Sequence, residues 1–225
     1  MKIMIDAGHG FETAGKRTVD EKMREYEFNR VVANAVRLEL QQYESVAVYF
    51  SHSDQKDIPL QERTDEANSL NVDLFVSIHA NAYGNGRDWN SVQGIETFVY
   101  LTNPTEAKKL ATQVQAQLVK MTGRTDRGVK TANLHVLRET KMTAILCECG
   151  FMTNKEEAAM LMTEEYRFKC AQSIVKGIVN CYKLKKKTQQ ALYHVQVGAF
   201  SKKASAETLI AKLKMQGFDA YLKVE

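Results

Sequence analysis

The sequence of 225 residues predicts an α/β fold: a central, mostly parallel sheet flanked by helices, followed by a small C-terminal strand–helix–strand (βαβ) unit. Two observations carry this prediction. Short runs rich in β-formers alternate along the chain with segments of helical period, and a charged run without apolar periodicity separates the end of the chain from the rest. A composition of 44% hydrophobic and 26% charged residues is that of a globular protein.

Six short β-rich runs are predicted to form the sheet. Because helical segments separate most of them, neighbouring strands can be joined by crossover helices, which gives the sheet its parallel character. The predicted strands are Lys2–Asp6, Val46–Ser51, Asp73–His79, Val92–Leu101, Leu134–Arg138 and Thr143–Cys149.

Apolar residues recur at helical spacing between these runs. In the strongest case, Pro104 can occupy the first helical position, where its missing N–H costs nothing, and Gly123 can end the helix. Pro59 similarly precedes another helical segment. The predicted helices are 28–38, Leu60–Leu70, Asn103–Gly123 and 168–181.

Charge, hydropathy and cysteine usage exclude several classes of function. A net charge of +4 is too small for the footprint of a nucleic-acid-binding protein, and no apolar run approaches the roughly 18 residues of a membrane span. The first residues leave no room for a secretory signal peptide, so we expect synthesis in the cytoplasm. The cysteines lack zinc-knuckle spacing and are predicted to be reduced core residues: Cys147, Cys149, Cys170 and Cys181.

Three apolar strands each end in a residue that can bind a metal or transfer a proton. His9 follows the first strand and lies between two glycines, and His79 and Glu148 end later strands. In an α/β sheet, ligands bind at the edge formed by the carboxyl ends of the strands. Glu25, at the start of the next helix, adds a second carboxylate. Each residue alone could be structural, but together they supply two imidazoles and two carboxylates.

This set of side chains fits one zinc ion. Hydrolytic zinc sites commonly take three N or O ligands, with His₂Glu among the known sets, and keep one position open for water. His9, Glu25 and His79 are the predicted ligands. Glu148 is the predicted catalytic base, which takes a proton from water and passes it to the leaving amine. Glu27 is the alternative to Glu25, and a thiol mechanism is disfavoured because the strand cysteines are expected to be buried.

Seven sequence motifs follow one another along residues 1–182. They are Asp6–Gly10, Glu25–Asn29, Leu60 with Arg63 and Ala67–Asn68, Ser77–Asn81, Asp126–Lys130, Val136–Glu139 and Glu148–Asn154. In these motifs the chain resembles the zinc-dependent N-acetylmuramoyl-L-alanine amidases of bacterial autolysins and phage endolysins. The resemblance implies the zinc amidase fold and one Zn²⁺ per chain on His9, Glu25 and His79. It also implies that Glu148 is catalytic and that the substrate is peptidoglycan. The bond cleaved would join the N-acetylmuramic acid lactyl group to L-alanine of the stem peptide.

Four further residues are candidate substrate contacts. Lys130 and Arg138 could hold carboxylates of the stem peptide through charge-assisted hydrogen bonds. His135 alternates with apolar neighbours on a predicted strand, which would point it away from the core and toward a substrate groove. Asn81 belongs to the motif that contains the second histidine. For Lys130, Arg138 and His135, a solvated surface position is the alternative.

One position departs from the amidase pattern. His52 stands where the family often has arginine. Because arginine there is usually linked to structural pairing, the departure puts a local contact in doubt rather than the chemistry.

The end of the chain is predicted to form a separate module. A charged linker, residues 183–190, follows the catalytic domain at 1–182. Through Tyr193–Phe200, Ala206–Glu207 and Gly217–Tyr221, residues 191–225 resemble the opening half of a SPOR domain. That resemblance implies binding to glycan strands. A unit of this size is too small to fold alone, so we expect two copies to pair in a homodimer. Packing on the chain's own catalytic domain and a truncated module are the alternatives. The predicted elements are a strand at Tyr193–Phe200, a helix at Ala204–Gln216 and a strand at Ala220–Val224.

An enzyme with this activity needs a route to the cell wall. The expected routes are a phage holin, for an endolysin, or lysis of a sporulating mother cell, for an autolysin, and both stay open. The alternative to an enzyme is a non-catalytic cell-wall-binding protein that retains the amidase fold, which the complete set of four chemical residues disfavours. A zinc carboxypeptidase would share the metal chemistry but not the motifs.

Overall fold

A computed structural model describes residues 1–188, 195–218 and 220–223. The chain divides into two compact units, Met1–Lys187 and Thr188–Glu225, and each is described by itself. In the described residues, none of the helices has the length and apolar character that crossing a membrane requires.

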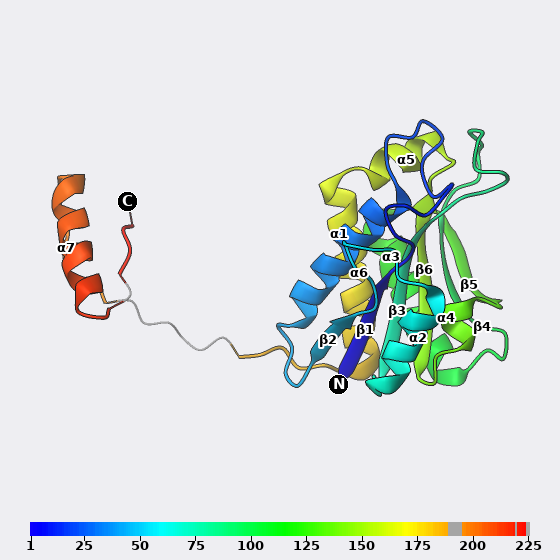
Figure 1. The fold of residues 1–225 in the computed structure, drawn as a ribbon, viewed down its shortest axis with the longest axis horizontal. Helices are drawn as coiled ribbons and strands as arrows, with labels where there is room; N and C mark the ends of the chain where they lie inside the picture. Colours follow the sequence, from blue (N-terminus) through cyan, green and yellow to red (C-terminus); the bar gives the residue numbers. More distant parts are fainter. Residues whose placement is uncertain (189–194, 219, 224–225) are drawn as a thin grey trace. The chain divides into compact units, whose positions relative to one another are not determined.

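The larger unit is built on one six-stranded sheet, in the order β2-β1-β3-β6-β4-β5 (Figure 1). β2, β1, β3 and β6 are parallel, β4 runs antiparallel to β6, and β5 is parallel to β4. The predicted mostly parallel sheet is therefore confirmed, and the carboxyl ends of β1, β3 and β6 share one edge. The strands are β1 (Lys2–Ala7), β2 (Ala47–Phe50), β3 (Leu74–Asn81), β4 (Ile95–Tyr100), β5 (Asp126–Ala132) and β6 (Thr143–Phe151).

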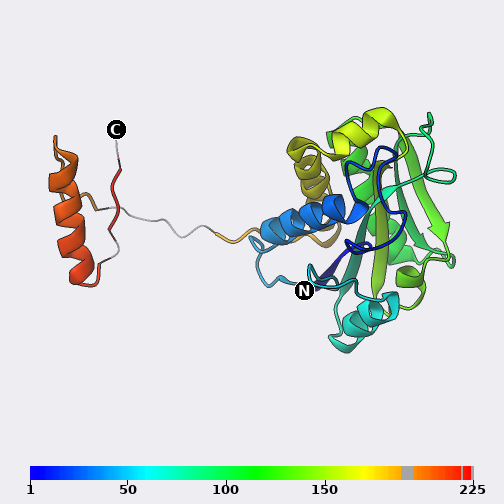
Figure 2. The same ribbon diagram turned by 45° about the horizontal axis from the view of Figure 1, so that its top comes forward.

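Helices cover both faces of this sheet (Figures 1 and 2). They are α1 (Glu25–Leu40), α2 (Leu60–Ser69), α3 (Thr105–Thr122), α4 (His135–Arg138), α5 (Lys155–Leu161) and α6 (Glu164–Tyr182). The larger core joins one face to α1, α3 and α6 and includes Ile5 and Ile145. The smaller core, with Met4 and Leu146, joins the other face to α2 and α4. Alternate strand residues thus face different cores, as the period of a strand requires.

The four predicted helices are present as α1, α2, α3 and α6, but one predicted strand is wrong. Leu134–Arg138 contributes the short helix α4. Val136 and Leu137 are adjacent and both buried in the smaller core, and a helical turn can direct neighbouring side chains to one surface where a strand cannot. The sequence also concealed β5, whose polar residues form an edge strand, and the short helix α5.

The smaller unit contains the predicted helix as α7 (Lys203–Met215), in which no residue is buried. The described parts of the two predicted strands, 195–200 and 220–223, form no strand, and the remainder of each lies outside the described residues. A strand is defined by its ladder of hydrogen bonds, and a sheet of only two short strands is marginal in water.

Candidate active site

A row of polar side chains crosses three strands at one edge of the sheet. His79 on β3 pairs with Glu148 on β6, and Glu148 pairs with Glu96 on β4. Paired residues project from the same face, so the three side chains are neighbours. Leu146, two residues before Glu148 on β6, projects from the same face and belongs to the smaller core. The polar row therefore lies at the edge of the smaller core.

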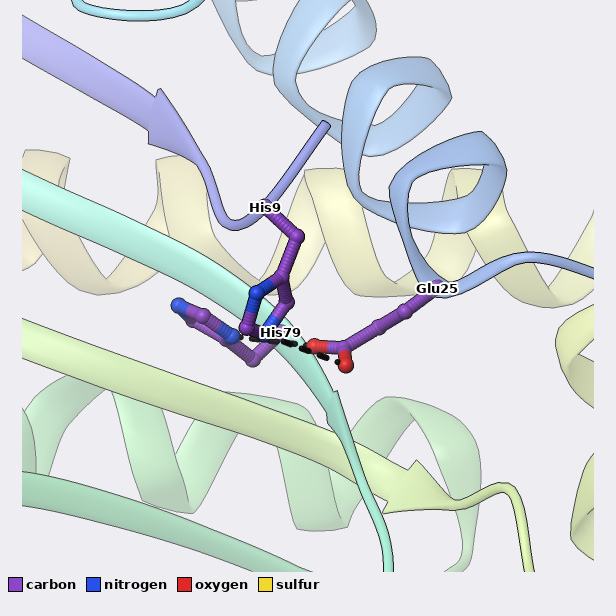
Figure 3. A group of neighbouring side chains, drawn as sticks. All are labelled: His9, Glu25 and His79. Carbon is purple, nitrogen blue, oxygen red and sulfur yellow. Dashed lines mark hydrogen bonds and ion pairs between the residues drawn. The ribbon is translucent and has the colours of Figure 1, made fainter. Parts of the chain in front are cut away.

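Two histidines and a glutamate meet at one end of the row (Figure 3). His9 Nε2 lies 3.2 Å from Glu25 Oε2, and His79 Nδ1 lies 2.9 Å from Glu25 Oε1. One ligand atom from each of the three residues lies within 4.8 Å of the others, which is close enough for all three to hold a single metal ion. The two imidazoles and the carboxylate are donors that suit zinc.

The local backbone explains why these side chains converge. A Cβ on Gly8 would lie 2.0 Å from His79 Cε1, so only glycine leaves room for that ring. His9 follows with a φ of 66°, a left-handed conformation that turns the chain sharply after β1. Glu25 is the first residue of α1, while the Glu27 carboxylate accepts the Arg24 N–H and caps the helix. Glu25 therefore reaches the cluster and Glu27 does not.

A buried hydrogen-bond network around Asp6 stabilises the histidine–glutamate cluster. Asp6, 1% exposed, accepts hydrogen bonds from the hydroxyls of Ser51 and Ser77 and from the Arg63 guanidinium. Arg63 also donates to the His9 carbonyl at 2.7 Å, and Ser77 Oγ lies 3.0 Å from His79 Nε2. The network thus ties the loop that carries one histidine to the strand that carries the other.

The departure at His52 is accommodated locally. His52 Nδ1 accepts a hydrogen bond from the Ala7 N–H at 3.0 Å, and its ring contacts Phe50. Burial lowers the pKa of His52, because the charged form is poorly solvated there. The position supports the end of β1 and is not a member of the histidine–glutamate cluster.

The pKa values of Glu25 and Glu148 are shifted in opposite directions. Burial alone would raise the pKa of Glu25, but hydrogen bonds from His79 and His9 outweigh it and hold the pKa well below its usual range. The pKa of His79 is raised, because the Glu25 carboxylate outweighs the effect of burial. In contrast, burial raises the pKa of Glu148 to about 8; His79 opposes this rise, and the carboxylates of Glu25 and Glu96 add to it.

Glu148 is also set apart by its hydrogen bonding. Its Oε2 atom is buried and has no hydrogen-bond partner among the described residues. An orphaned carboxylate oxygen is costly in a folded protein and is found where a substrate, water or ion completes the site. Of the four residues expected to carry the chemistry, the structure brings His9, Glu25 and His79 together and places Glu148 beside them.

Glu96 is a functional candidate that the sequence did not reveal. Its carboxylate accepts hydrogen bonds from Asn81 Nδ2 at 2.8 Å, Arg127 Nε at 2.7 Å and Lys130 Nζ at 2.5 Å. Two of the predicted substrate contacts, Asn81 and Lys130, therefore meet at one carboxylate next to Glu148 in the row. A charged residue within a strand of mainly apolar residues was the available signal.

The other two predicted substrate contacts lie elsewhere. β5 runs away from Glu148, and α4 follows its far end, so His135 and Arg138 belong to the opposite part of the sheet. His135 Nε2 lies 3.5 Å from Thr64 Oγ1, and Arg138 is paired with Glu139. Their contact with substrate stays a prediction, and the strand on which the argument for His135 depended is absent.

The strand cysteines do not reach the polar row. Cys147 and Cys149 flank Glu148 on β6, so they face the larger core, where both are fully buried. Burial raises the pKa of the Cys147 thiol, and a hydrogen bond with Cys170 together with burial raises that of Cys149. Neither thiol is poised to act as a nucleophile.

Comparison with known proteins places both units in families. Residues 3–180 match the sequence profile of the N-acetylmuramoyl-L-alanine amidase family, and residues 189–225 match the SPOR domain. The sporulation-specific N-acetylmuramoyl-L-alanine amidase of Bacillus subtilis is 33% identical over 98% of this chain and 83% of that protein. The N-acetylmuramoyl-L-alanine amidase CwlM of Bacillus licheniformis is 35% identical over the same shares.

Solved structures agree with the sequence comparison. An N-acetylmuramoyl-L-alanine amidase from Clostridium difficile has a TM-score of 0.76 at 34% identity, covering 81% of this chain and 96% of that one. The catalytic domain of CwlV from Paenibacillus polymyxa has a TM-score of 0.75 at 34% identity, covering 82% and 99%. The expected resemblance is confirmed: this chain belongs to the N-acetylmuramoyl-L-alanine amidase family and is a peptidoglycan amidase with a C-terminal SPOR domain.

Proposed function

We propose that His9, Glu25 and His79 hold one zinc ion and that Glu148 is the catalytic acid and base. The bond hydrolysed is the amide between the N-acetylmuramic acid lactyl group and L-alanine of the stem peptide. The observation that supports this assignment is the unpartnered, buried Glu148 Oε2 beside a cluster of three metal-capable side chains. Zinc bound there would polarise the amide carbonyl and lower the pKa of a bound water.

Each protein group has a separate task in this proposal. Glu148 removes a proton from the attacking water and later delivers it to the leaving α-amine of L-alanine. Ser77, bound to Asp6, contacts the second nitrogen of the His79 ring and keeps the first directed at the cluster.

Digestion of purified cell walls tests the reaction. We expect new L-alanine amino termini and no new reducing sugar ends. New reducing ends would instead indicate a glycosidase and contradict the proposal.

A Glu148→Gln variant tests the division of roles. It should lose hydrolysis and still bind one equivalent of zinc, because glutamine keeps the shape of the side chain but cannot accept the proton. Metal analysis after dialysis provides the second measurement. Loss of zinc from this variant would mean that Glu148 is a ligand.

For the smaller unit, we propose binding to the glycan strands of peptidoglycan, which its SPOR match supports. A variant that ends at Lys187 should cleave soluble muropeptides at the rate of the full chain and sediment less with purified walls. Equal sedimentation of the two forms would contradict the assignment.

We further propose that two copies of this unit pair in a homodimer. The proposal is supported by large apolar side chains that are exposed within the unit, and an interface would cover them. They include Val195, Val197, Phe200, Met215 and Phe218. Light scattering after size exclusion should give twice the monomer mass, and a strict monomer at micromolar concentration would exclude pairing. Phe200→Asp should dissociate the dimer, whereas Phe168→Asp, at an exposed position of the larger unit, should not.

Release through a holin or through mother-cell lysis stays a prediction.

A further inference from the structure

The Glu96 network lies on the side of Glu148 opposite the histidines. Glu96 is 5% exposed, and the ion pairs of Arg127 and Lys130 in the described structure both end on its Oε2 atom. One buried carboxylate thus holds two cations, which leaves one surplus positive charge. The side chains of Arg127 and Lys130 are 31% and 40% exposed, so a solute can reach them.

Arg127 is held in place by more than its ion pair. Its guanidinium lies 5.0 Å from the centre of the Phe151 ring, and one of its terminal nitrogens is 3.4 Å from the Gln93 carbonyl. An arginine fixed in this way loses little side-chain entropy when it binds a ligand. Its geometry is therefore suited to recognising a planar anion such as a carboxylate.

Hydrogen bonds to the Glu157 side chain hold the start of β4 against the end of β6, which fixes Glu96 next to Glu148. Glu157, 1% exposed, accepts the N–H groups of Gly94 and Phe151 at 2.9 and 2.7 Å. A Cβ on Gly94 would lie 2.5 Å from the Thr125 carbonyl oxygen, so glycine is needed for the close approach of the two segments. The network is a built part of the edge and not a chance surface pairing.

Its distance from the histidines matches the length of a short peptide. His79, Glu148 and Glu96 lie on three neighbouring strands, so the outer two backbones are about 10 Å apart at the usual strand spacing. An extended peptide advances about 3.5 Å per residue. A carboxylate attached two to three residues beyond a bond held at the histidine cluster would therefore arrive at the cations.

We propose that Arg127 and Lys130, positioned by Glu96, form a subsite that binds the α-carboxylate of the second residue of the stem peptide, where that residue is joined to the third through its side chain and its α-carboxyl is therefore free. The proposal rests on the proposed amidase function and names the chemistry recognised beyond the scissile bond. Glu96 is a positioning residue here, because it acts through the two cations and does not itself contact the anion.

A matched pair of muropeptides tests the subsite. Both carry the disaccharide and the same stem peptide, and they differ only in whether the α-carboxyl of the second residue is free or amidated. We expect the full-length enzyme to have a kcat/KM about tenfold higher for the free acid, because a charge-assisted hydrogen bond is lost in the amide. In Arg127→Gln and in Lys130→Gln this preference should fall to about threefold or less, and Lys130→Arg should retain it.

Lys109→Gln is the matched control, since it removes an exposed cation that is paired with Glu106 on α3. It should keep the tenfold preference. Thermal unfolding of each variant verifies folding. Binding of the same two muropeptides to the zinc-loaded Glu148→Gln protein, measured by calorimetry, should show a similar difference in Kd. This measurement does not depend on turnover.

The two proposals can fail separately. An enzyme that releases L-alanine amino termini from walls but treats both muropeptides alike, in rate and in Kd, contradicts the subsite and leaves the amidase proposal standing. A preference that persists in both charge-removing variants also contradicts the subsite. Walls that yield no new amino termini contradict the amidase proposal, and the subsite with it.

Discussion

Two buried carboxylates flank Glu148, and the partners they hold differ in kind. Glu25 lies between two imidazoles, and Glu96 lies between a guanidinium and an ammonium group. An imidazole gives up its proton near neutral pH and then offers a lone pair, whereas the other two groups stay protonated and offer only N–H donors. A buried carboxylate thus takes part in a metal site on one side of Glu148 and in an anion site on the other. The partners, not the carboxylate, decide what each side can bind.

The largest effect is expected on the histidine side. His79→Ala should lose its zinc on dialysis and lower kcat/KM at least about a hundredfold, because the site keeps only two of three ligands. Metal analysis and muropeptide hydrolysis measure the two losses. His135→Ala, on α4 and outside the cluster, should keep its zinc. A His79→Ala protein that retained stoichiometric zinc would refute the ligand assignment.

A smaller loss on the same side should follow from Gly8→Ala. The added methyl would lie 2.0 Å from the His79 ring and must displace it, so zinc affinity should fall about tenfold to a hundredfold. Competition with a chromophoric chelator measures the affinity. Gly84→Ala is the control: nothing lies within 4 Å of its added methyl, and the backbone strain that alanine meets at its φ of 74° does not involve the His79 ring. Unchanged affinity in Gly8→Ala would show that the ring has freedom the structure does not indicate.

The two sides also differ in how far the sequence could predict them. His9, His79 and Glu148 each follow an apolar run, and the parallel order of β1, β3 and β6 brings the ends of these runs to one edge. The rule that ligands bind at the carboxyl ends of parallel strands was therefore enough to predict these three residues. It could not find Glu96, which lies near the start of β4, because only the antiparallel direction of that strand brings its beginning to the same edge.

Local sequence was equally unable to place the cations. Arg127 and Lys130 lie on β5, which was not predicted as a strand because most of its residues are polar. They meet Glu96 only through a register shift between β4 and β5. Conversely, α4 was expected to be a strand because its apolar residues were assigned to alternate faces. Long-range pairing, which no short segment contains, decided both cases.

The anion side gives a third, smaller test. Glu96→Gln should raise KM for the free-acid muropeptide about fivefold, because the cations lose their anchor, while zinc content and kcat change much less. Steady-state kinetics with metal analysis separate these quantities. Glu106→Gln, which removes an exposed carboxylate paired with Lys109, should leave KM unchanged. An equal fall in kcat with constant KM would mean that Glu96 acts on the chemical step instead of on binding.

The smallest expected effect is the pH dependence of the stability that Glu96 contributes to the fold. Burial alone would raise the pKa of Glu96, but Lys130 and Arg127 outweigh it, so the pKa lies below its ordinary value of 4.5. A group with a depressed folded-state pKa stabilises the fold above its unfolded pKa and loses this contribution as pH falls through the folded pKa. The wild type should therefore exceed Glu96→Gln in free energy of unfolding by about 1 kcal/mol or less near pH 6, since the cations are partly exposed. The difference should vanish below about pH 3. Urea unfolding with a chelator present measures it without a contribution from bound zinc, and a difference that is constant with pH would show that the cations do not hold Glu96 ionised.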